Sequence, residues 1–451
     1  MPGIISKFKI DKLFGYDSFD IDIENNVLII VGENGSGKTT VLRLLCYFLL
    51  GKWSLLLQYS FNSLTAIINN EEIVIERDVL EDGIIKYDER FLKRYPPSIR
   101  NKIKEFIIEQ DESIDMSKLE IFSDKYGIPM TILLEEIEEI EMGLSHNNKL
   151  NSIKNKIDQF LDTKILYLPT YRRIEQDLSW IFRGEDVREW NFFKKSLLSR
   201  KNRSFELIEF GMQDVEATIN HTLQQLKDFT IEKSTALTLG YLGEVVDQKY
   251  SQIDVSEIKN TKEEVIDDIL GRIDDTILSN SQKSHLRQTI HEVRIGEKFS
   301  EHAKVLCHYF LKLLNLQQDL TKREESITAF CEVCNQYMVN KRLIYDSSSF
   351  NFSIVMEESY KAASEVKMPH LSSGEKQIVS LFSHLYLSGH QHFFVIIDEP
   401  ELSLSVTWQR RFLTDILDGG FCSGLIAATH SPFIYDNSLN HKTHGIGEFL
   451  L

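Results

Sequence analysis

The chain has 451 residues, a formal net charge of −17, 42% apolar residues and 26% charged residues. This length predicts two or three structural units, and the fractions of apolar and charged residues are ordinary for a soluble globular protein. The negative charge argues against nonspecific nucleic-acid binding over the whole surface, although it leaves room for a local basic groove. The most apolar stretch, residues 41–58, contains Arg43 and Lys52. We therefore interpret it as a core helix rather than a membrane span.

The N-terminal sequence and the cysteines indicate a cytoplasmic protein. The first ten residues lack the apolar segment of a secretory signal. Five cysteines are scattered without the spacing of a disulfide framework. Cys331 and Cys334 form a C-x-x-C pair, but no second Cys/His pair lies close enough to complete a zinc site. We expect two thiols packed on a helix.

The first hundred residues alternate between strand and helix patterns. Period-two alternation predicts strands at 4–10 and 19–23, and an apolar run predicts a third at 26–31. A helix is expected from about residue 38 to 50. Two further strands, 63–68 and 71–76, are separated by Asn69-Asn70, which is typical of a tight hairpin turn.

The middle of the chain is mainly helical and charged. Residues 96–164 include an acidic stretch at 133–140, interpreted as an amphipathic helix with a solvated face, and a short buried strand is expected at 165–168. Sheet returns at 343–346 and 350–356, followed by a helix at 375–387 and a buried strand at 393–397. The predicted divisions are 1–98, 99–164, 165–180, 181–339 and 340–451.

A phosphate-binding loop follows the third strand. It fits the pattern G-x-x-x-x-G-K-[ST] and stands between a strand and a helix. Its glycines let backbone N–H groups surround phosphate oxygens, and the helix N-terminus favours negative charge. The side chain of Lys38 should reach the β- and γ-phosphates of ATP, and the Thr39 hydroxyl should bind Mg²⁺. The candidate nucleotide-binding residues are Gly32, Glu33, Asn34, Gly35, Ser36, Gly37, Lys38, Thr39 and Thr40.

An acidic pair, Asp398 and Glu399, ends the strand at 393–397. Sheets of α/β proteins bind ligands at this end of their strands. Asp398 is suited to holding Mg²⁺, and Glu399 to polarising the attacking water as a general base. Alone, such a pair is most often a helix cap or a loop, and its combination with a P-loop favours the catalytic interpretation.

Two more segments carry polar residues at element ends. Ser372 and Glu375 can form a capping box at the start of a helix, with small residues around them. His430 follows a strand near the C-terminus. On the residues alone, the first segment could simply be a well-capped helix, and a lone histidine is more often structural than functional. The first segment consists of Leu371, Ser372, Ser373, Gly374 and Glu375.

The four motifs in this order resemble the soluble ABC-type ATPases of the SMC/OLD-like group. Residues 371–375 resemble the ABC signature, 402–405 the D-loop and His430 the switch histidine. The resemblance covers roughly 1–77 and 340–451. It implies an α/β ABC head, with a mixed sheet and a P-loop core, interrupted by a largely helical insertion. It also implies a composite ATP site, in which the signature acts on a second copy of the chain.

The implied catalytic residues are Lys38, Glu399 and His430. Ser373 in place of the first signature glycine, and Ser405 where related proteins often have His or Asp, leave the hydrolysis rate open.

The separation of Lys38 from Ser372 is far longer than in transporter cassettes of this family, which predicts a helical lobe or a short coiled coil. The segment after the strand at 165–168 could supply the Mg²⁺-sensing Q-loop. Gln176 is the candidate ligand. The alternatives are that Arg172 or Arg173 meets phosphate or a partner, or that the turn is simply exposed. A basic and aromatic cluster at 190–203 is interpreted as a solvated helix face, with phosphate or nucleic-acid contact as the alternative.

The segment 398–404 and the serine-rich signature resemble the OLD-type ATPases and, among them, the ATPase subunits of two-gene antiphage systems such as PARIS and Septu. The chain ends shortly after His430, so we expect any nuclease to be a separate polypeptide. The resemblance implies a sensor or scaffold that restrains or licenses an effector, either a TOPRIM or an HNH nuclease, in dimers or in hexamers. A phage protein or DNA is a further candidate partner. The alternatives are a DNA-repair ATPase that clamps DNA and a slow-turnover assembly scaffold.

Overall fold

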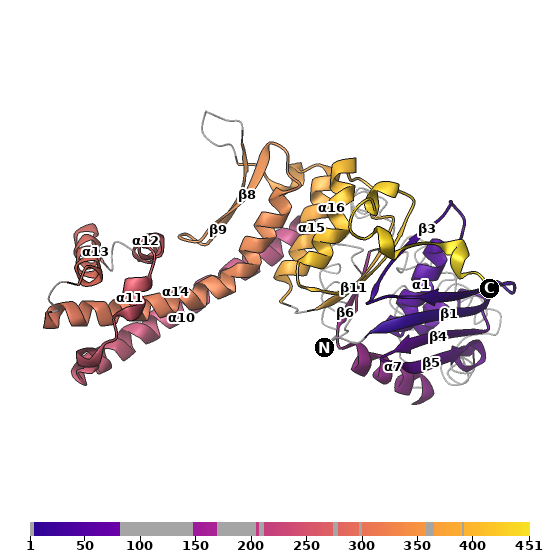
Figure 1. Ribbon diagram of the computed structural model, residues 1–451, viewed down its shortest axis with the longest axis horizontal. Helices are drawn as coiled ribbons and strands as arrows, with labels where there is room; N and C mark the ends of the chain where they lie inside the picture. Colours follow the sequence, from indigo (N-terminus) through magenta and orange to yellow (C-terminus); the bar gives the residue numbers. More distant parts are fainter. Residues whose placement is uncertain are drawn as a thin grey trace, which may run out of the picture. The chain divides into compact units, whose positions relative to one another are not determined.

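The structure is a computed structural model, and its contacts divide the chain into two units (Figure 1). One unit comprises Met1–Glu209 and His390–Leu451, and the other comprises Phe210–Gly389. The finer divisions expected from the sequence remain a prediction. The described residues are 4–81, 148–168, 204–206, 212–273, 278–296, 300–357, 365–389 and 392–451.

The first unit is built on a parallel sheet. Within the described residues it has six strands in the order β12-β3-β11-β10-β6-β7, and every neighbouring pair is parallel. The central strand β10 is buried at all of its positions, as expected for a strand covered on both faces. The strands are β12 (Thr443–Gly445), β3 (Val27–Val31), β11 (Cys422–Thr429), β10 (Phe393–Asp398), β6 (Lys164–Leu168) and β7 (Ser204–Glu206).

The helix α1 (Lys38–Leu50) packs on this sheet against β6, β10 and β11. Alternate residues of the strands, such as Phe394 and Ile396, share one core with α1, because side chains of a strand alternate between its faces. The helix α16 (Val406–Asp418) packs against β11. Other helices in the described part of this unit include α2 (Trp53–Leu56), α7 (Asn148–Leu161), and the 3₁₀ turns η4 (Pro432–Ile434), η5 (Asn440–Lys442) and η6 (Ile446–Phe449).

An antiparallel sheet completes the first unit. Its strand order is β2-β1-β4-β5. The ring of Phe8 on β1 meets that of Phe48 on α1 edge to face, with centroids 5.8 Å apart, so this sheet and α1 share the core. The strands are β1 (Ile5–Leu13), β2 (Asp17–Asp22), β4 (Ser63–Ile68) and β5 (Glu71–Glu76).

The parallel strands end at one common edge. Val31, the last residue of β3, pairs with Thr429, the last residue of β11. Asp398 at the end of β10 pairs with Ala428. This alignment brings together the loops that follow three strands, where open α/β sheets place their ligands.

The second unit contains two long helices, α10 (Met212–Val246) and α14 (Glu301–Asn335), which lie side by side in Figure 1. The guanidinium of Arg323 lies 3.9 Å from the ring centroid of Phe229, and Lys312 pairs with Glu244. A later residue of α10 thus meets an earlier residue of α14, so the pair is antiparallel. The two helices form an antiparallel hairpin within the largely helical insertion that the sequence predicts.

Short helices pack near the turn of this hairpin and enclose a small core of their own with α14. They are η2 (Lys249–Gln252), α11 (Ser256–Asn260), α12 (Glu263–Arg272) and α13 (Asn280–Arg294). The chain then forms the β-hairpin β8 (Lys341–Asp346) and β9 (Asn351–Met356), the turn η3 (Met368–His370), and the helix α15 (Ser373–Leu387), which packs against both long helices.

The sequence predicted these elements closely. The helix at 38–50 has the expected bounds, and so has the hairpin at 63–76, where Asn69 and Asn70 adopt positive φ of 52° and 66°. The expected fold class, an α/β head interrupted by a largely helical insertion, is confirmed. The acidic stretch at 133–140 lies outside the described residues.

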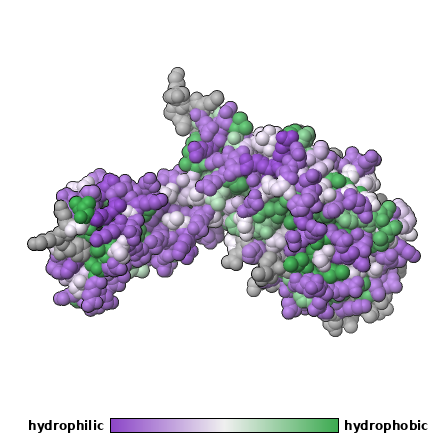
Figure 2. All heavy atoms as spheres, in the orientation of Figure 1, coloured by the Kyte–Doolittle hydropathy of each residue, from purple (hydrophilic) through white to green (hydrophobic). Residues whose placement is uncertain are grey.

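The surface is mainly hydrophilic on the face drawn in Figure 2, with apolar residues in small groups. Some of the exposed apolar side chains belong to α10, where Leu239, Leu242 and Val246 point to solvent. None of the helices in the described part of the chain is long and apolar enough to cross a bilayer.

Candidate nucleotide site

The loop between β3 and α1 folds around the ammonium group of Lys38. Gly35 and Gly37 have φ of 80° and 90°, a conformation that favours glycine over residues with a Cβ. Lys38 is 5% exposed, and its Nζ donates to the carbonyl oxygens of Gly32 and Glu33, both at 2.9 Å. No side chain caps the N-terminus of α1. Its first N–H groups therefore face the loop, where the helix dipole favours an anion.

The other residues of the loop differ in exposure. Glu33, Asn34 and Gly35 are exposed at its tip, and Thr40, in the first turn of α1, is half-buried. The Ser36 hydroxyl lies 3.5 Å from the Lys38 Nζ. The loop thus presents backbone groups at its tip and keeps its cation inside.

Thr39 and Asp398 meet at the sheet edge. The hydroxyl Oγ1 of Thr39 donates to Oδ1 of Asp398 at 3.2 Å, and Asp398 is 3% exposed. Hydroxyl and carboxylate oxygens are the ligand types that Mg²⁺ prefers, usually with retained water. The two residues therefore fit the magnesium position expected from the sequence.

Glu399 turns the chain sharply after β10. Its φ is 48°, a left-handed conformation that is uncommon outside glycine and is concentrated at functional sites. Its backbone N–H donates to the carbonyl of Ala428 at 2.8 Å, and this hydrogen bond anchors the turn after β10 on the neighbouring strand β11. The carboxylate oxygen Oε1 lies 4.0 Å from Nε2 of His430. Glu399 thus lies next to the histidine rather than out in solvent.

His430 lies between the lysine and this glutamate. Its Nδ1 is 3.5 Å from Nζ of Lys38. An ammonium group can only donate, so this contact fits the tautomer in which Nδ1 accepts and Nε2, on the side of Glu399, carries the ring proton. The ring nitrogens of His430 thus approach both the ammonium group of Lys38 and the carboxylate of Glu399, at the strand edge where a terminal phosphate and its attacking water could be held.

The electrostatics of the site centre on Lys38. Burial lowers the pKa of Lys38, and the nearby carboxylates of Asp398, Glu399 and Glu401 act in the opposite direction. These acidic neighbours favour the charged form of the lysine. Burial outweighs these carboxylates, so the pKa of Lys38 is lowered overall, and a phosphate bound beside Lys38 would favour its charged form further.

Residues 4–435 match the family profile of the AAA ATPase domain. The chain belongs to the AAA ATPase domain family. Two solved structures are similar. The Smc head domain of Pyrococcus furiosus, with an extended coiled coil and bound to the C-terminal domain of ScpA, is 13% identical, with 96% of this chain and 91% of that chain covered and a TM-score of 0.33. The Smc head domain of Pyrococcus yayanosii, with a coiled coil and joint, is 14% identical, with 96% and 93% covered and a TM-score of 0.29. A comparison with curated proteins gave no match.

The signature segment, residues 371–375, which resembles the ABC signature, belongs to the second unit. The expected capping box is present: Ser372 Oγ accepts from the N–H of Glu375 at 3.4 Å, and Glu375 Oε2 accepts from the N–H of Ser372 at 2.7 Å. Lys341 adds an ion pair to Glu375 at 2.8 Å. Leu371 and Gly374 are buried, whereas Ser372 and Ser373 are exposed. The two serines are therefore accessible at the start of α15.

Sequence reasoning gave no role to Glu401 and Gln409, which form hydrogen bonds to the segment around His430. No helical or strand periodicity distinguishes Glu401 as a functional residue. The only indication in the sequence is its place directly after Asp398-Glu399-Pro400.

Other features predicted from the sequence lie either outside the described residues or on another element. The Q-loop candidate Gln176, the arginines 172 and 173, and the basic cluster at 190–203 fall outside the described residues. Cys331 and Cys334 are buried on α14, as expected for packed thiols. Burial raises the pKa of Cys331 to about 12, which keeps it a thiol.

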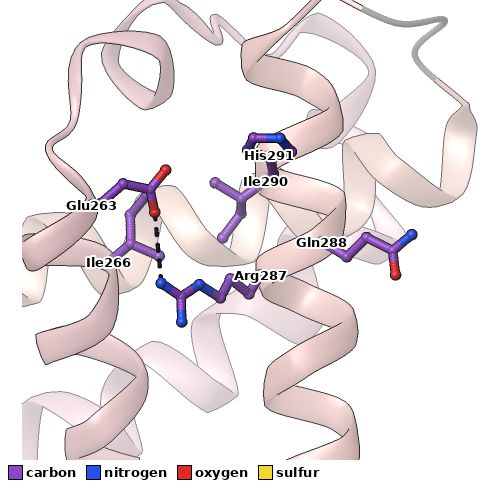
Figure 3. Close-up of a pocket in the computed structure, with 6 residues that line it drawn as sticks. All are labelled: Glu263, Ile266, Arg287, Gln288, Ile290 and His291. Carbon is purple, nitrogen blue, oxygen red and sulfur yellow. Dashed lines mark ion pairs between the residues drawn. The ribbon is translucent and has the colours of Figure 1, made fainter.

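A pocket in the second unit has a different character. It has a volume of about 400 Å³ and lies between α12 and α13 (Figure 3). The ion pair of Glu263 and Arg287, 3.9 Å apart, lies in it. It contains none of the motif residues. The other lining residues are Ile266, Gln288, Ile290 and His291.

Proposed function

We propose that this chain binds and hydrolyses ATP with Mg²⁺. The observation that carries this proposal is the convergence of Lys38, Thr39, Asp398, Glu399 and His430 on one edge of one sheet. Thr39 and Asp398 would hold Mg²⁺, which would supply charge neutralisation for the phosphates. Lys38 holds the phosphates through charge-assisted hydrogen bonds. Glu399 takes the proton of the attacking water, and His430 donates through Nε2 toward the reacting group.

We further propose that the site is completed by the signature of a second copy. The accessible Ser372 and Ser373 at the start of α15 support this arrangement, because a helix N-terminus is suited to binding phosphate. In this dimer, ATP joins the P-loop of one subunit to the signature of the other.

ATP turnover by the wild type and by Glu399→Gln tests hydrolysis. Loss of the general base should lower kcat about 100-fold or more, while ATP binding is retained. Glu71→Gln on β5 is the matched control, since Glu71 is exposed and lies on the other sheet. Equal turnover by all three proteins contradicts the proposed role of Glu399. A wild-type rate that is already negligible, with ATP still bound, favours the slow-turnover scaffold.

We propose that ATP binding controls a separate effector, a TOPRIM or HNH nuclease, in antiphage defence. The support is the resemblance of the segment 398–404 to the defence ATPases. Affinity purification from cells carrying the native operon, followed by mass spectrometry and sizing, tests it. We expect a stoichiometric nuclease-like partner, in dimeric or hexameric assemblies. The absence of a partner, together with tight, salt-sensitive duplex binding by the purified chain, supports a DNA clamp instead.

A further inference from the structure

Glu401 binds the segment that carries His430 through both of its carboxylate oxygens. Oε1 accepts from the backbone N–H groups of His430 at 2.8 Å and of Ser431 at 3.1 Å. Oε2 accepts from the hydroxyl of Thr429 at 2.7 Å. Three consecutive residues therefore donate to one carboxylate.

These hydrogen bonds form where β11 ends and the backbone leaves the sheet. Thr429 is the last residue of β11 and is fully buried, so the N–H groups that follow it have left the strand ladder. An unpaired N–H near a buried strand end is costly, and a hydrogen bond to a charged acceptor is stronger than one to a neutral acceptor. Glu401 thus fixes the direction in which the chain leaves β11.

A second side chain supports the same junction. Gln409 on α16 donates to the carbonyl of Leu404 at 2.9 Å and accepts from the Ser431 hydroxyl at 2.6 Å. Leu404 itself donates to the carbonyl of Glu401 at 3.1 Å. The segment 399–405 and the segment 429–431 are therefore joined by two independent side chains.

The ring of His430 depends on this backbone position. Its two nitrogens lie 3.5 Å from Lys38 and 4.0 Å from Glu399, so a small rotation of the backbone at residue 430 changes both distances. A misplacement of about 1 Å in an active site can reduce rate about 100-fold. Glu401 has three donors on its two oxygens, which suits a positioning group and leaves the role of general base to Glu399.

We propose that Glu401 is the positioning residue for His430, and that through it the position of the segment 402–405 controls the alignment of the histidine with the phosphate site. This inference rests on the proposed ATP hydrolysis. It assigns a function to a carboxylate whose two oxygens both accept hydrogen bonds from residues 429–431. It also supplies a physical connection between the segment that resembles the D-loop and the residue that resembles the switch histidine.

A double-mutant cycle tests the proposal in the full-length chain. The proteins are wild type, Glu401→Ala, His430→Ala and the double variant, with ATP turnover as the readout. Glu401→Ala should lower kcat roughly 10- to 100-fold and change KM for ATP less than about threefold. If Glu401 acts through His430, the double variant should be no slower than His430→Ala.

Glu401→Gln serves as the conservative variant. Its amide oxygen can still accept from the two backbone N–H groups, so it should recover most of the lost rate. If Glu401→Ala does not fold, Gln409→Ala, which removes the other side-chain hydrogen bond to residue 431, replaces it in the cycle. Rate losses that multiply in the double variant, or a rate per folded molecule that is unchanged in Glu401→Ala, overturn the proposal.

A second readout does not depend on ATP turnover. In protein with ¹³C-labelled histidine, the ring signal of His430 is identified by its loss in His430→Ala. That signal should shift in Glu401→Ala and return toward its wild-type position in Glu401→Gln. An unshifted signal overturns the proposal. A wild type that neither binds nor hydrolyses ATP contradicts the proposed function, while the NMR comparison still decides whether Glu401 positions the histidine.

Discussion

Thr39 and Asp398 are 359 residues apart in the chain, yet their side chains form a hydrogen bond of 3.2 Å. Thr39 is placed by the start of α1, and Asp398 by the end of β10. Both positions are fixed by regular elements rather than by loops. A cation held between them would therefore be bound by a rigid pair of oxygen ligands, which favours a defined geometry and a small ion such as Mg²⁺.

If Thr39 and Asp398 together hold Mg²⁺, the increase in ATP affinity caused by Mg²⁺ should require both residues. In Thr39→Ala, and separately in Asp398→Asn, Mg²⁺ should no longer increase the affinity for ATP, because one oxygen ligand or its charge is lost. The expected loss is roughly tenfold in affinity with Mg²⁺ present, equivalent to about 1.4 kcal/mol. ATP titrations with Mg²⁺ and with EDTA measure it. Thr407→Ala, at an exposed position of α16, is the control.

The outcome that contradicts the assignment is an equal effect of Mg²⁺ on the wild type and on both variants. A uniform loss of affinity, with and without Mg²⁺, would instead indicate damage to the P-loop itself.

Single residues show what the sequence could and could not predict. Lys38 and Asp398 were expected at one sheet edge, because each follows an apolar run in a motif of fixed spacing and parallel strands end together. Glu401 was missed because its partners lie 28 to 30 residues away, at the end of another strand. Gln409 bonds to Ser431 across 22 residues. Such contacts depend on the register of strands, which no local pattern records.

At the level of elements, the start of α15 is held by a side chain from a different element. The capping box of Ser372 and Glu375 could be predicted, since its residues are three apart. Lys341 at the beginning of β8 is 34 residues away, and it pairs with Glu375 at 2.8 Å. The β-hairpin thereby fixes the charge state and the orientation of the residue that caps the signature helix.

The pair of Lys341 and Glu375 should make stability depend on pH. Burial acts to raise the pKa of Glu375, but its hydrogen bonds to Lys341 and Ser372 outweigh burial, and the net pKa is lowered. A carboxylate whose pKa is lower in the folded chain stabilises folding at neutral pH. That stabilisation is lost as pH falls from about 4.5, the ordinary value, through the folded pKa.

Lys341→Met tests this interaction. At pH 7 we expect this variant to lose about 2 kcal/mol in free energy of unfolding. The loss is smaller than for a fully buried ion pair because Lys341 retains some solvent contact. Without Lys341, less opposes the effect of burial, so the pKa of Glu375 should rise in the variant. The difference in free energy of unfolding between wild type and variant should therefore shrink as the pH falls from 7 to 4. Urea denaturation at several pH values measures both quantities. Lys259→Met, at an exposed position of α11, is the control. A difference that does not vary with pH contradicts the ion-pair explanation.

At the scale of the whole molecule, the phosphate-binding edge and the signature belong to different units of the chain. The first unit contains the P-loop, Asp398, Glu399 and His430, whereas the signature begins α15 in the second unit. In the proposed dimer, one ATP site is divided between two subunits, so closure of the dimer would depend on nucleotide. Occupancy by ATP would then change the assembly that the proposed partner protein meets.

A mixing experiment tests the divided site. Lys38→Ala removes the phosphate ligand, and Ser372→Arg places a large cation at the signature, so each variant alone should be inactive. In a mixed dimer, one site combines both changes, but the other combines the intact P-loop of the Ser372→Arg subunit with the intact signature of the Lys38→Ala subunit. Random pairing makes half of the dimers mixed, so we expect about one quarter of the wild-type ATP turnover. A mixture that stays inactive, although sedimentation shows exchange of subunits, contradicts a signature acting in trans. A mixture of Lys38→Ala with Glu399→Gln is the matched control, because both changes lie in the same half of the site. Each of the two sites in the mixed dimer then contains one of the changes, so this mixture should stay inactive.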